Sequence, residues 1–317
     1  MAIIRSEKPN FMIEIENLTK SFNRKKKKSK LGKITAVGHV NLTIKKGEIF
    51  GLIGPNGAGK TTMLKILSTL IIPDEGTATI DGFNVVKDVD AVKTRIGLLA
   101  GEFVRSFYWR LSGRQNLKFF ANLRGMWHPD GRISELIELF NLKNHEDELV
   151  MKYSTGMKHK LALATGLLHD PPVLFLDEPL TGIDPVTTYE IKDLIKNEFK
   201  DKTIIWASHN LYEVEEMCDR IALFNHGKVV LKGTPDSLKK DCWDHIKVMV
   251  TSDKPYAFSS LQNAEIKDNV VEIKAYDVKK TFLTIAEIVQ EKNVEILNIQ
   301  TLKPTLEEIF RKGIEND

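Results

Sequence analysis

The chain has 317 residues, of which 42% are hydrophobic and 28% are charged, and its formal net charge is +3. This composition is typical of a folded globular protein and excludes a disordered or collagen-like chain. No run of 18 apolar residues without a charge occurs, so we expect no membrane-spanning segment, and the N-terminus lacks the apolar core of a signal peptide. The two cysteines, Cys218 and Cys242, indicate neither a disulfide framework nor a zinc site and favour a reducing, cytosolic compartment.

The positive charge is concentrated in one segment. Residues 24–33 hold seven basic side chains and no acidic one, so the rest of the chain is net acidic. This basic run is either a solvated loop or a segment attracted to anionic lipid headgroups. Because no aromatic residues are interleaved with it and the body of the chain is not basic, we expect no nucleic-acid partner.

The first two thirds of the chain alternate between short strands and helices. The pattern predicts strands at 12–18, 34–44, 49–53, 173–176 and 204–207, and a helix at 60–70. The last two strands are fully apolar, as in a parallel sheet buried on both faces. Apolar residues at helical spacing between about 105 and 170 predict a helical insertion between strands of that sheet.

A smaller unit is predicted to follow. Its pattern indicates strands at 246–250, 271–275 and 294–299, and helices at 278–289 and 304–311. We therefore predict an α/β fold with a β-rich N-terminal part in a domain over 12–235, and a small α+β domain over 244–317.

The strongest motif is a glycine-rich turn between a predicted strand and a predicted helix. It matches the phosphate-binding pattern G-x-x-x-x-G-K-[ST], the P-loop. Glycines let backbone N–H groups approach phosphate oxygens, and the helix N-terminus adds its positive end. Lys60 is expected to reach the β- and γ-phosphates, and Thr61 to ligate Mg²⁺. The residues predicted to bind ATP here are Gly54, Pro55, Asn56, Gly57, Ala58, Gly59, Lys60, Thr61 and Thr62.

A second motif consists of an apolar strand that ends in two carboxylates, Asp177 and Glu178. This is the Walker B pattern of P-loop proteins. We expect Asp177 to hold Mg²⁺ through water and Glu178 to orient and deprotonate the attacking water. The alternative interpretation is a strand end that carries two solvated acids.

Five motifs together resemble the nucleotide-binding subunit of ATP-binding cassette (ABC) transporters over roughly residues 12–235. They are the P-loop, the YSTGMK segment at 153–158, the FLDEP segment at 175–179, the TGID segment at 181–184 and Ser208-His209. The resemblance implies that Ser154, Thr155, Gly156 and Met157 form the signature, which binds the γ-phosphate held by the P-loop of a second subunit. It also implies that His209 contacts the γ-phosphate and helps to position the water, and that Asp184 crosses the subunit interface.

The sequence departs from the family pattern at some positions. The signature has Tyr, Thr and Met where the family usually has Leu, Gly and Gln, and no glutamine follows the strand at 95–99. Glu102 either replaces that glutamine as a Mg²⁺ ligand or is only a loop residue. Phe22 is the candidate to stack on adenine. The aromatic residues at 107–109 belong either to the core or to a contact with a membrane subunit.

The resemblance implies an ATPase that uses ATP and Mg²⁺ and powers transport. The expected partners are integral membrane permease subunits and a second copy of the chain, at the cytoplasmic face of the membrane. The ending at 303–310 is similar to subunits of drug or polysaccharide exporters, which favours export of a cargo that the sequence does not name. Two alternatives from other classes are a soluble cassette ATPase acting on ribosomes or DNA, and a small-molecule kinase. The first would need a tandem cassette or a coiled-coil insertion, and the second would not explain the signature.

Overall fold

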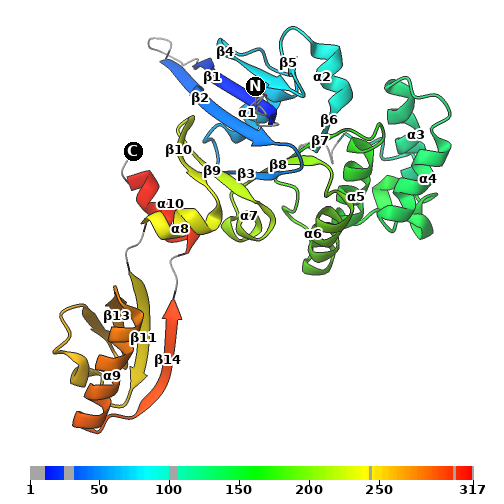
Figure 1. Ribbon diagram of the computed structural model, residues 1–317. Helices are drawn as coiled ribbons and strands as arrows, with labels where there is room; N and C mark the ends of the chain where they lie inside the picture. The colour runs from blue at the N-terminus through cyan, green and yellow to red at the C-terminus, as the bar shows by residue number, and fades with distance from the viewer. Residues whose placement is uncertain (1–10, 25–31, 100–105, 243–244, 303–304, 316–317) are drawn as a thin grey trace, which may run out of the picture. The chain divides into compact units, whose positions relative to one another are not determined.

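The computed structural model describes residues 11–24, 32–99, 106–242, 245–302 and 305–315. They group into two compact units, the first ending at Lys232 and the second beginning at Gly233 (Figure 1). Most of the basic run and the predicted Mg²⁺ ligand Glu102 lie outside the described residues. Along the described ranges, no helix has the length and apolarity needed to cross a membrane.

An antiparallel sheet with the strand order β2-β1-β4-β5 forms the N-terminal part of the first unit. Its strands are β1 (Phe11–Arg24), β2 (Gly32–Lys45), β4 (Glu75–Ile80) and β5 (Phe83–Asn84). The β1 strand extends beyond the predicted 12–18 because its pairing with β2 continues as far as Arg24. The apolar alternation ends earlier, so the partner strand determines where β1 ends.

The second sheet of this unit contains the predicted buried strands, in the order β10-β9-β3-β8-β7-β6. The strands are β3 (Ile49–Ile53), β6 (Ile96–Leu99), β7 (Val173–Asp177), β8 (Thr203–Ser208), β9 (Arg220–Asn225) and β10 (Lys228–Gly233). β3 and β7 both pair in parallel with β8. Because parallel strands end at the same edge of a sheet, the residues that follow β3, β7 and β8 lie close together.

Helices connect and cover these strands (Figure 1). They are α1 (Lys60–Leu67), α2 (Val89–Arg95), α3 (Gly113–Leu123), α4 (Asp130–Leu139), α5 (Thr155–Gly166), α6 (Pro185–Glu198) and α7 (Leu211–Met217). The helices α3, α4 and α5 are the predicted insertion, with short 3₁₀ turns at Lys143–His145 and Val150–Lys152. A reciprocal capping pair fixes the start of α3, where Ser112 Oγ accepts from Gln115 N–H and Gln115 Oε1 accepts from Ser112 N–H.

One continuous apolar core joins the two sheets of the first unit to α1. It contains side chains from the antiparallel sheet, such as Ile13 and Ile80, together with Phe50 and Phe175 of the parallel sheet and Met63 of α1. These residues are fully buried. The loop between β3 and α1 is therefore held from both ends by packed elements, which fixes its position.

Among its described residues, the second unit contains an antiparallel sheet with the order β12-β13-β11-β14 and three helices. The elements are α8 (Pro235–Cys242), β11 (Ile246–Ser252), a 3₁₀ turn at Pro255–Phe258, β12 (Ala264–Lys267), β13 (Val270–Ala275), α9 (Val278–Lys292), β14 (Ile296–Leu302) and α10 (Leu306–Glu315). Ile285 and Ile288 of α9 pack on Val248 and Val250 of the sheet. The predicted α/β fold with a small α+β C-terminal unit is confirmed. The predicted strand at 294–299 instead begins at Ile296, because the N–H of Val294 donates to the carbonyl oxygen of Val289 at the end of α9, while its side chain packs in the core.

Candidate nucleotide site

Glycines shape the loop between β3 and α1 in the way that a phosphate-binding loop requires. Gly59 has φ of 113°, and a Cβ atom at this position would collide with the carbonyl oxygen of Ala36. A Cβ atom on Gly54 would collide with the carbonyl oxygen of Phe224. Gly57 has φ of 82° with open space around it, so its conformation rather than crowding favours glycine. The backbone of Gly54–Gly59 is thus held against neighbouring strands with its N–H groups near the start of α1.

Lys60 lies over this loop in a buried position. Its Nζ donates to the carbonyl oxygens of Gly54 at 2.6 Å and Pro55 at 3.3 Å. Burial lowers the pKa of the Lys60 ammonium, and the negative charges of Glu178 and Asp177 partly oppose this effect. Among the described residues, the hydrogen bonds of this ammonium go to neutral carbonyls, and it would bind phosphate oxygens more strongly, because hydrogen bonds between two charged groups are stronger.

Thr61 and Asp177 meet at the end of β7. Thr61 Oγ1 donates to Asp177 Oδ2 at 2.8 Å, whereas Asp177 Oδ1 is buried and has no hydrogen-bond partner among the described atoms. Burial raises the pKa of the Asp177 carboxyl group, and the Thr61 hydrogen bond opposes that shift. A buried carboxylate oxygen without a partner destabilises the fold unless a cation or a hydrogen-bond donor reaches it. The pair therefore fits a bound cation.

Glu178 and His209 are brought together from the ends of two adjacent strands. His209 Nδ1 lies 2.8 Å from each carboxylate oxygen of Glu178. Thr181 Oγ1 also donates to Glu178 Oε2, at 3.2 Å. The backbone of Glu178 has φ of 52°, which is uncommon for a residue with a side chain, and its N–H donates to Ala207 of β8 at 2.8 Å. These contacts hold a carboxylate, which can accept a proton from a bound water, beside an imidazole.

The predicted signature and Asp184 cap two neighbouring helices. Ser154 Oγ accepts from Met157 N–H at 3.2 Å at the start of α5, and Asp184 Oδ1 accepts from Thr187 N–H at 3.0 Å at the start of α6. This bond lowers the pKa of the exposed Asp184 carboxyl group. Gly156 packs so closely that an added Cβ atom would lie 2.7 Å from Thr187 Cγ2. The N-terminal ends of α5 and α6 are therefore in close contact.

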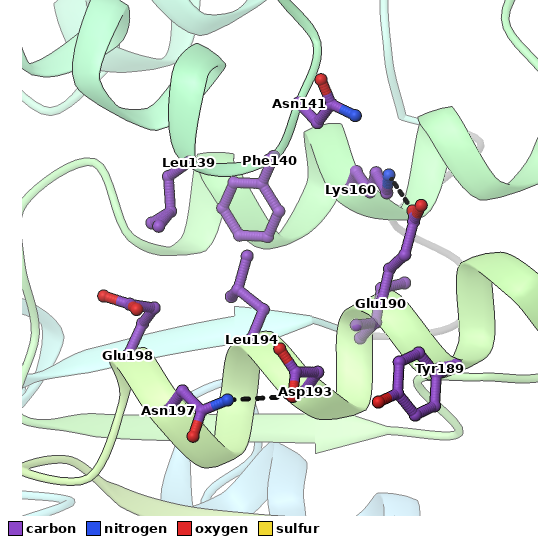
Figure 2. Close-up of a pocket in the computed structure, with 11 residues that line it drawn as sticks. Leu139, Phe140, Asn141, Lys160, Tyr189, Glu190, Asp193, Leu194, Asn197 and Glu198 are labelled. Atoms are coloured by element: carbon purple, nitrogen blue, oxygen red, sulfur yellow. Dashed lines mark hydrogen bonds and ion pairs between the residues drawn. The ribbon is translucent and has the colours of Figure 1, made fainter.

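An ion pair and a shared pocket continue this α5–α6 contact along the helices (Figure 2). Lys160 of α5 donates to Glu190 of α6 at 2.6 Å, beside a pocket lined by Phe140 and by Leu194 of α6. Ser154 and Thr155 are exposed, and along the described ranges no hydrogen bond or ion pair joins them to the P-loop of the same chain. The structure thus does not bring the signature and the P-loop of one chain into contact.

The remaining predicted contacts involve aromatic side chains. Phe22 of β1 is 43% exposed, and Lys20 Nζ lies 5.7 Å from the centre of its ring, so a ring surface remains accessible. Among the aromatic residues at 107–109, Phe107 is part of the core, whereas Tyr108 and Trp109 are 50% and 57% exposed.

Two residues next to the site were not assigned a role by sequence reasoning. Thr181 lies within a recognised motif, but only the fold shows that its hydroxyl donates to Glu178. Thr187 carries no sequence signal, because its contact with Gly156 joins two different helices.

Comparison with known proteins agrees with this geometry. The sequence model of the family described as "ABC transporter" matches residues 37–181. The chain is 37% identical over 230 residues to the ABC transporter ATP-binding protein NatA of Bacillus subtilis. The aligned region covers 72% of this chain and 91% of NatA. It is 32% identical over 309 residues to the bacitracin transport ATP-binding protein BcrA of Bacillus licheniformis, covering 96% and 97%.

A solved structure has the same fold. It is a dimeric ATP-binding cassette in a post-hydrolysis state bound to ADP and Pi, with a TM-score of 0.62 and 26% identity, covering 70% of this chain and 98% of that one. The fold of that structure, the geometry of the loop at 54–59 and the two relatives all support the same family assignment. The chain belongs to the ABC transporter family as an ATP-binding subunit whose ATP hydrolysis is coupled to transport.

Proposed function

We propose that two copies of this chain bind ATP between them and power export through separate integral membrane permease subunits. The observation that carries the proposal is that Lys60, Asp177, Glu178 and His209 converge at one loop. Among the described residues, Ser154 of the same chain is exposed and forms no hydrogen bond with that loop. Such a site is completed when a second copy supplies its signature. That a related cassette was solved as a dimer supports this arrangement.

Each residue has a role that follows from its contacts. The backbone of Gly54–Gly59 and the Lys60 ammonium bind the phosphates, with Lys60 leaving its two carbonyl acceptors for phosphate oxygens. Glu178 accepts a proton from the attacking water, and His209 and Thr181 hold its carboxylate in place. Phe22 offers its exposed ring surface to adenine.

The residues that would hold Mg²⁺ are Thr61 and Asp177, through the hydroxyl group and the unpartnered carboxylate oxygen. Within the described residues, no group of three or more His, Cys, Asp or Glu side chains could hold a metal by itself. This agrees with Mg²⁺, which protein sites usually bind through one or two carboxylates together with substrate phosphates. When bound, the ion neutralises negative charge on the phosphates.

Export is favoured over import by the names of the relatives. Besides BcrA, they include the daunorubicin resistance ATP-binding protein DrrA3 of Streptomyces coeruleorubidus, which is 33% identical over 285 residues and covers 87% of this chain. The chain would then be a peripheral subunit at the cytoplasmic face of the membrane. Exposed Tyr108 and Trp109 are the candidate contacts with the permease.

The decisive experiment compares Glu178→Gln with Glu138→Gln, which makes the same chemical change at an exposed position of α4. We expect ATP turnover of Glu178→Gln to fall by roughly 10²–10⁴-fold, the usual contribution of a general base, with an ATP-bound dimer accumulating. Tagged Glu178→Gln should co-purify a polytopic membrane protein from detergent-solubilised membranes with Mg-ATP. Unimpaired turnover would contradict the role of Glu178. Recovery of ribosomes or nucleic acid without a membrane protein would contradict the proposal that two copies of the chain act with permease subunits.

A further inference from the structure

β14 is an exposed edge of the C-terminal sheet that lacks the usual protection. Among the described residues, it pairs only with β11. Six of its seven residues are exposed, and its sequence, ILNIQTL, contains no charged residue, proline or glycine. Natural edge strands are usually short, charged or interrupted, because their free N–H and C=O groups can pair with another chain.

The opposite edge of the same sheet is protected. β12 has only four residues, and its two exposed positions are Glu265 and Lys267. These two side chains lie 3.6 Å apart and form an ion pair. The absence of charge is therefore specific to the β14 edge and is not a general property of the unit.

The regular part of β14 is centred on Gln300. Its pairing with β11 runs without interruption from Asn298, opposite Thr251, to Leu302, opposite Lys247. A register shift follows at the Leu297 end, and such irregularities disturb the free edge. The stretch available to a further strand is thus Asn298–Leu302, in which Ile299 is 37% exposed and Leu302 is 45% exposed.

We propose that β14 pairs with β14 of a second copy of this chain, antiparallel about a two-fold axis at Gln300, so that two four-stranded sheets become one. In this arrangement Ile299 faces Thr301 of the second copy, and Gln300 faces its own counterpart. A charge on the axis would face an identical charge, whereas an amide offers both a donor and an acceptor to its copy. In this register the uncharged sequence brings no like charges face to face.

We assign a second copy of the chain to the β14 edge, and not another protein, because the proposed ATP site already requires two copies. In that respect the inference rests on the proposed function. The contact itself does not require nucleotide.

The test uses the full-length chain without nucleotide and measures dimerisation by sedimentation equilibrium. Gln300→Lys and Gln300→Glu each place like charges on the axis, and we expect each to raise the dissociation constant at least about tenfold, which corresponds to about 1.4 kcal/mol. An equimolar mixture of the two variants should restore association, because lysine then faces glutamate. The matched control is Gln262→Lys, at an exposed loop position of the same unit, and it should dimerise like the parent.

The outcomes separate this inference from the proposed function. A nucleotide-free parent that is monomeric, variants that associate like the parent, or a mixture that fails to restore association would each overturn β14 pairing. In Mg-ATP, Glu178→Gln combined with Gln300→Lys reports on the ATP-bound dimer independently, because the edge contact is then disabled. If that dimer fails to form while the nucleotide-free parent is dimeric, the proposed function fails and the edge contact stands. If that dimer forms while the nucleotide-free parent is monomeric, the edge contact alone is wrong.

Discussion

Replacing Gly156 by alanine should separate the starts of α5 and α6. The added Cβ atom would lie 2.7 Å from Cγ2, 2.9 Å from Oγ1 and 3.1 Å from Cβ of Thr187. Ordinary contacts of this kind measure 3.4–4 Å, so all three distances are too short. Rotation of the threonine side chain leaves its Cβ atom at 3.1 Å, which is tighter than nine in ten such contacts, so the helix starts must move apart by a few tenths of an ångström.

Two magnitudes follow from this clash. Overpacking in a well-packed region costs about 1–3 kcal/mol, so the free energy of unfolding should fall by that amount. The helix start that moves carries Ser154. Because a misplacement of about 1 Å in a group that positions a substrate can reduce the rate about 10²-fold, a shift of a few tenths of an ångström should reduce it by less than that. ATP turnover should therefore fall more than the loss of stability alone would explain.

The assay combines urea denaturation with steady-state ATP turnover. Gly166→Ala is the matched control, since it makes the same change in the same helix where the nearest atom to the new Cβ would be 3.8 Å away. We expect this control to keep both stability and turnover. Thr187→Gly removes all three clashing atoms and should restore part of the turnover of Gly156→Ala.

The reasoning would be refuted if Gly156→Ala hydrolysed ATP at the parent rate while Gly166→Ala did the same. It would also be refuted if Thr187→Gly in the Gly156→Ala background restored no turnover in a folded protein. In either case, the close α5–α6 contact would not position the signature.

Further predictions concern single contacts. Thr181→Val should lower turnover roughly 2- to 10-fold, because it removes a hydrogen bond of about 0.5–1.5 kcal/mol that holds the Glu178 carboxylate, and the free energy of unfolding should fall by no more than that amount. Glu190→Gln should change the free energy of unfolding by less than about 1 kcal/mol, because the pair with Lys160 is partly exposed. Burial, followed by the charge of Arg124, lowers the pKa of His169 from 6.5 to about 4. The unfolded chain thus takes up the proton first, stability falls as pH decreases from about 6.5 to about 4, and His169→Gln should flatten a pH series of urea midpoints in that window. Cys218 is buried with a raised thiol pKa and should react with a thiol reagent only on unfolding.

Sequence reasoning located the elements whose pattern is local. The apolar run at 49–53 coincides with β3, and the helix predicted at 60–70 begins at Lys60 as observed. It failed where a partner element sets the limit, as for β1, which β2 extends to Arg24, and for Val294, whose N–H donates to the end of α9 instead of pairing in β14. A strand boundary depends on what lies beside it, and a single sequence does not contain that information.

The candidate site likewise has features that the sequence predicts and contacts that only the fold shows. The glycines and lysine at 54–62 indicated phosphate chemistry by themselves, and with this motif upstream the paired carboxylates at 177–178 pointed to the same chemistry, whereas the role of His209 came from the family resemblance. The sequence could not show that His209 lies 2.8 Å from Glu178, that Asp177 keeps a buried oxygen without a partner, or that Gly156 is pressed against Thr187. Each of these facts joins segments that are distant in the chain. The motifs alone determined which chemistry the protein carries, whereas the parallel sheet, by bringing the ends of β3, β7 and β8 to one edge, decided where that chemistry takes place.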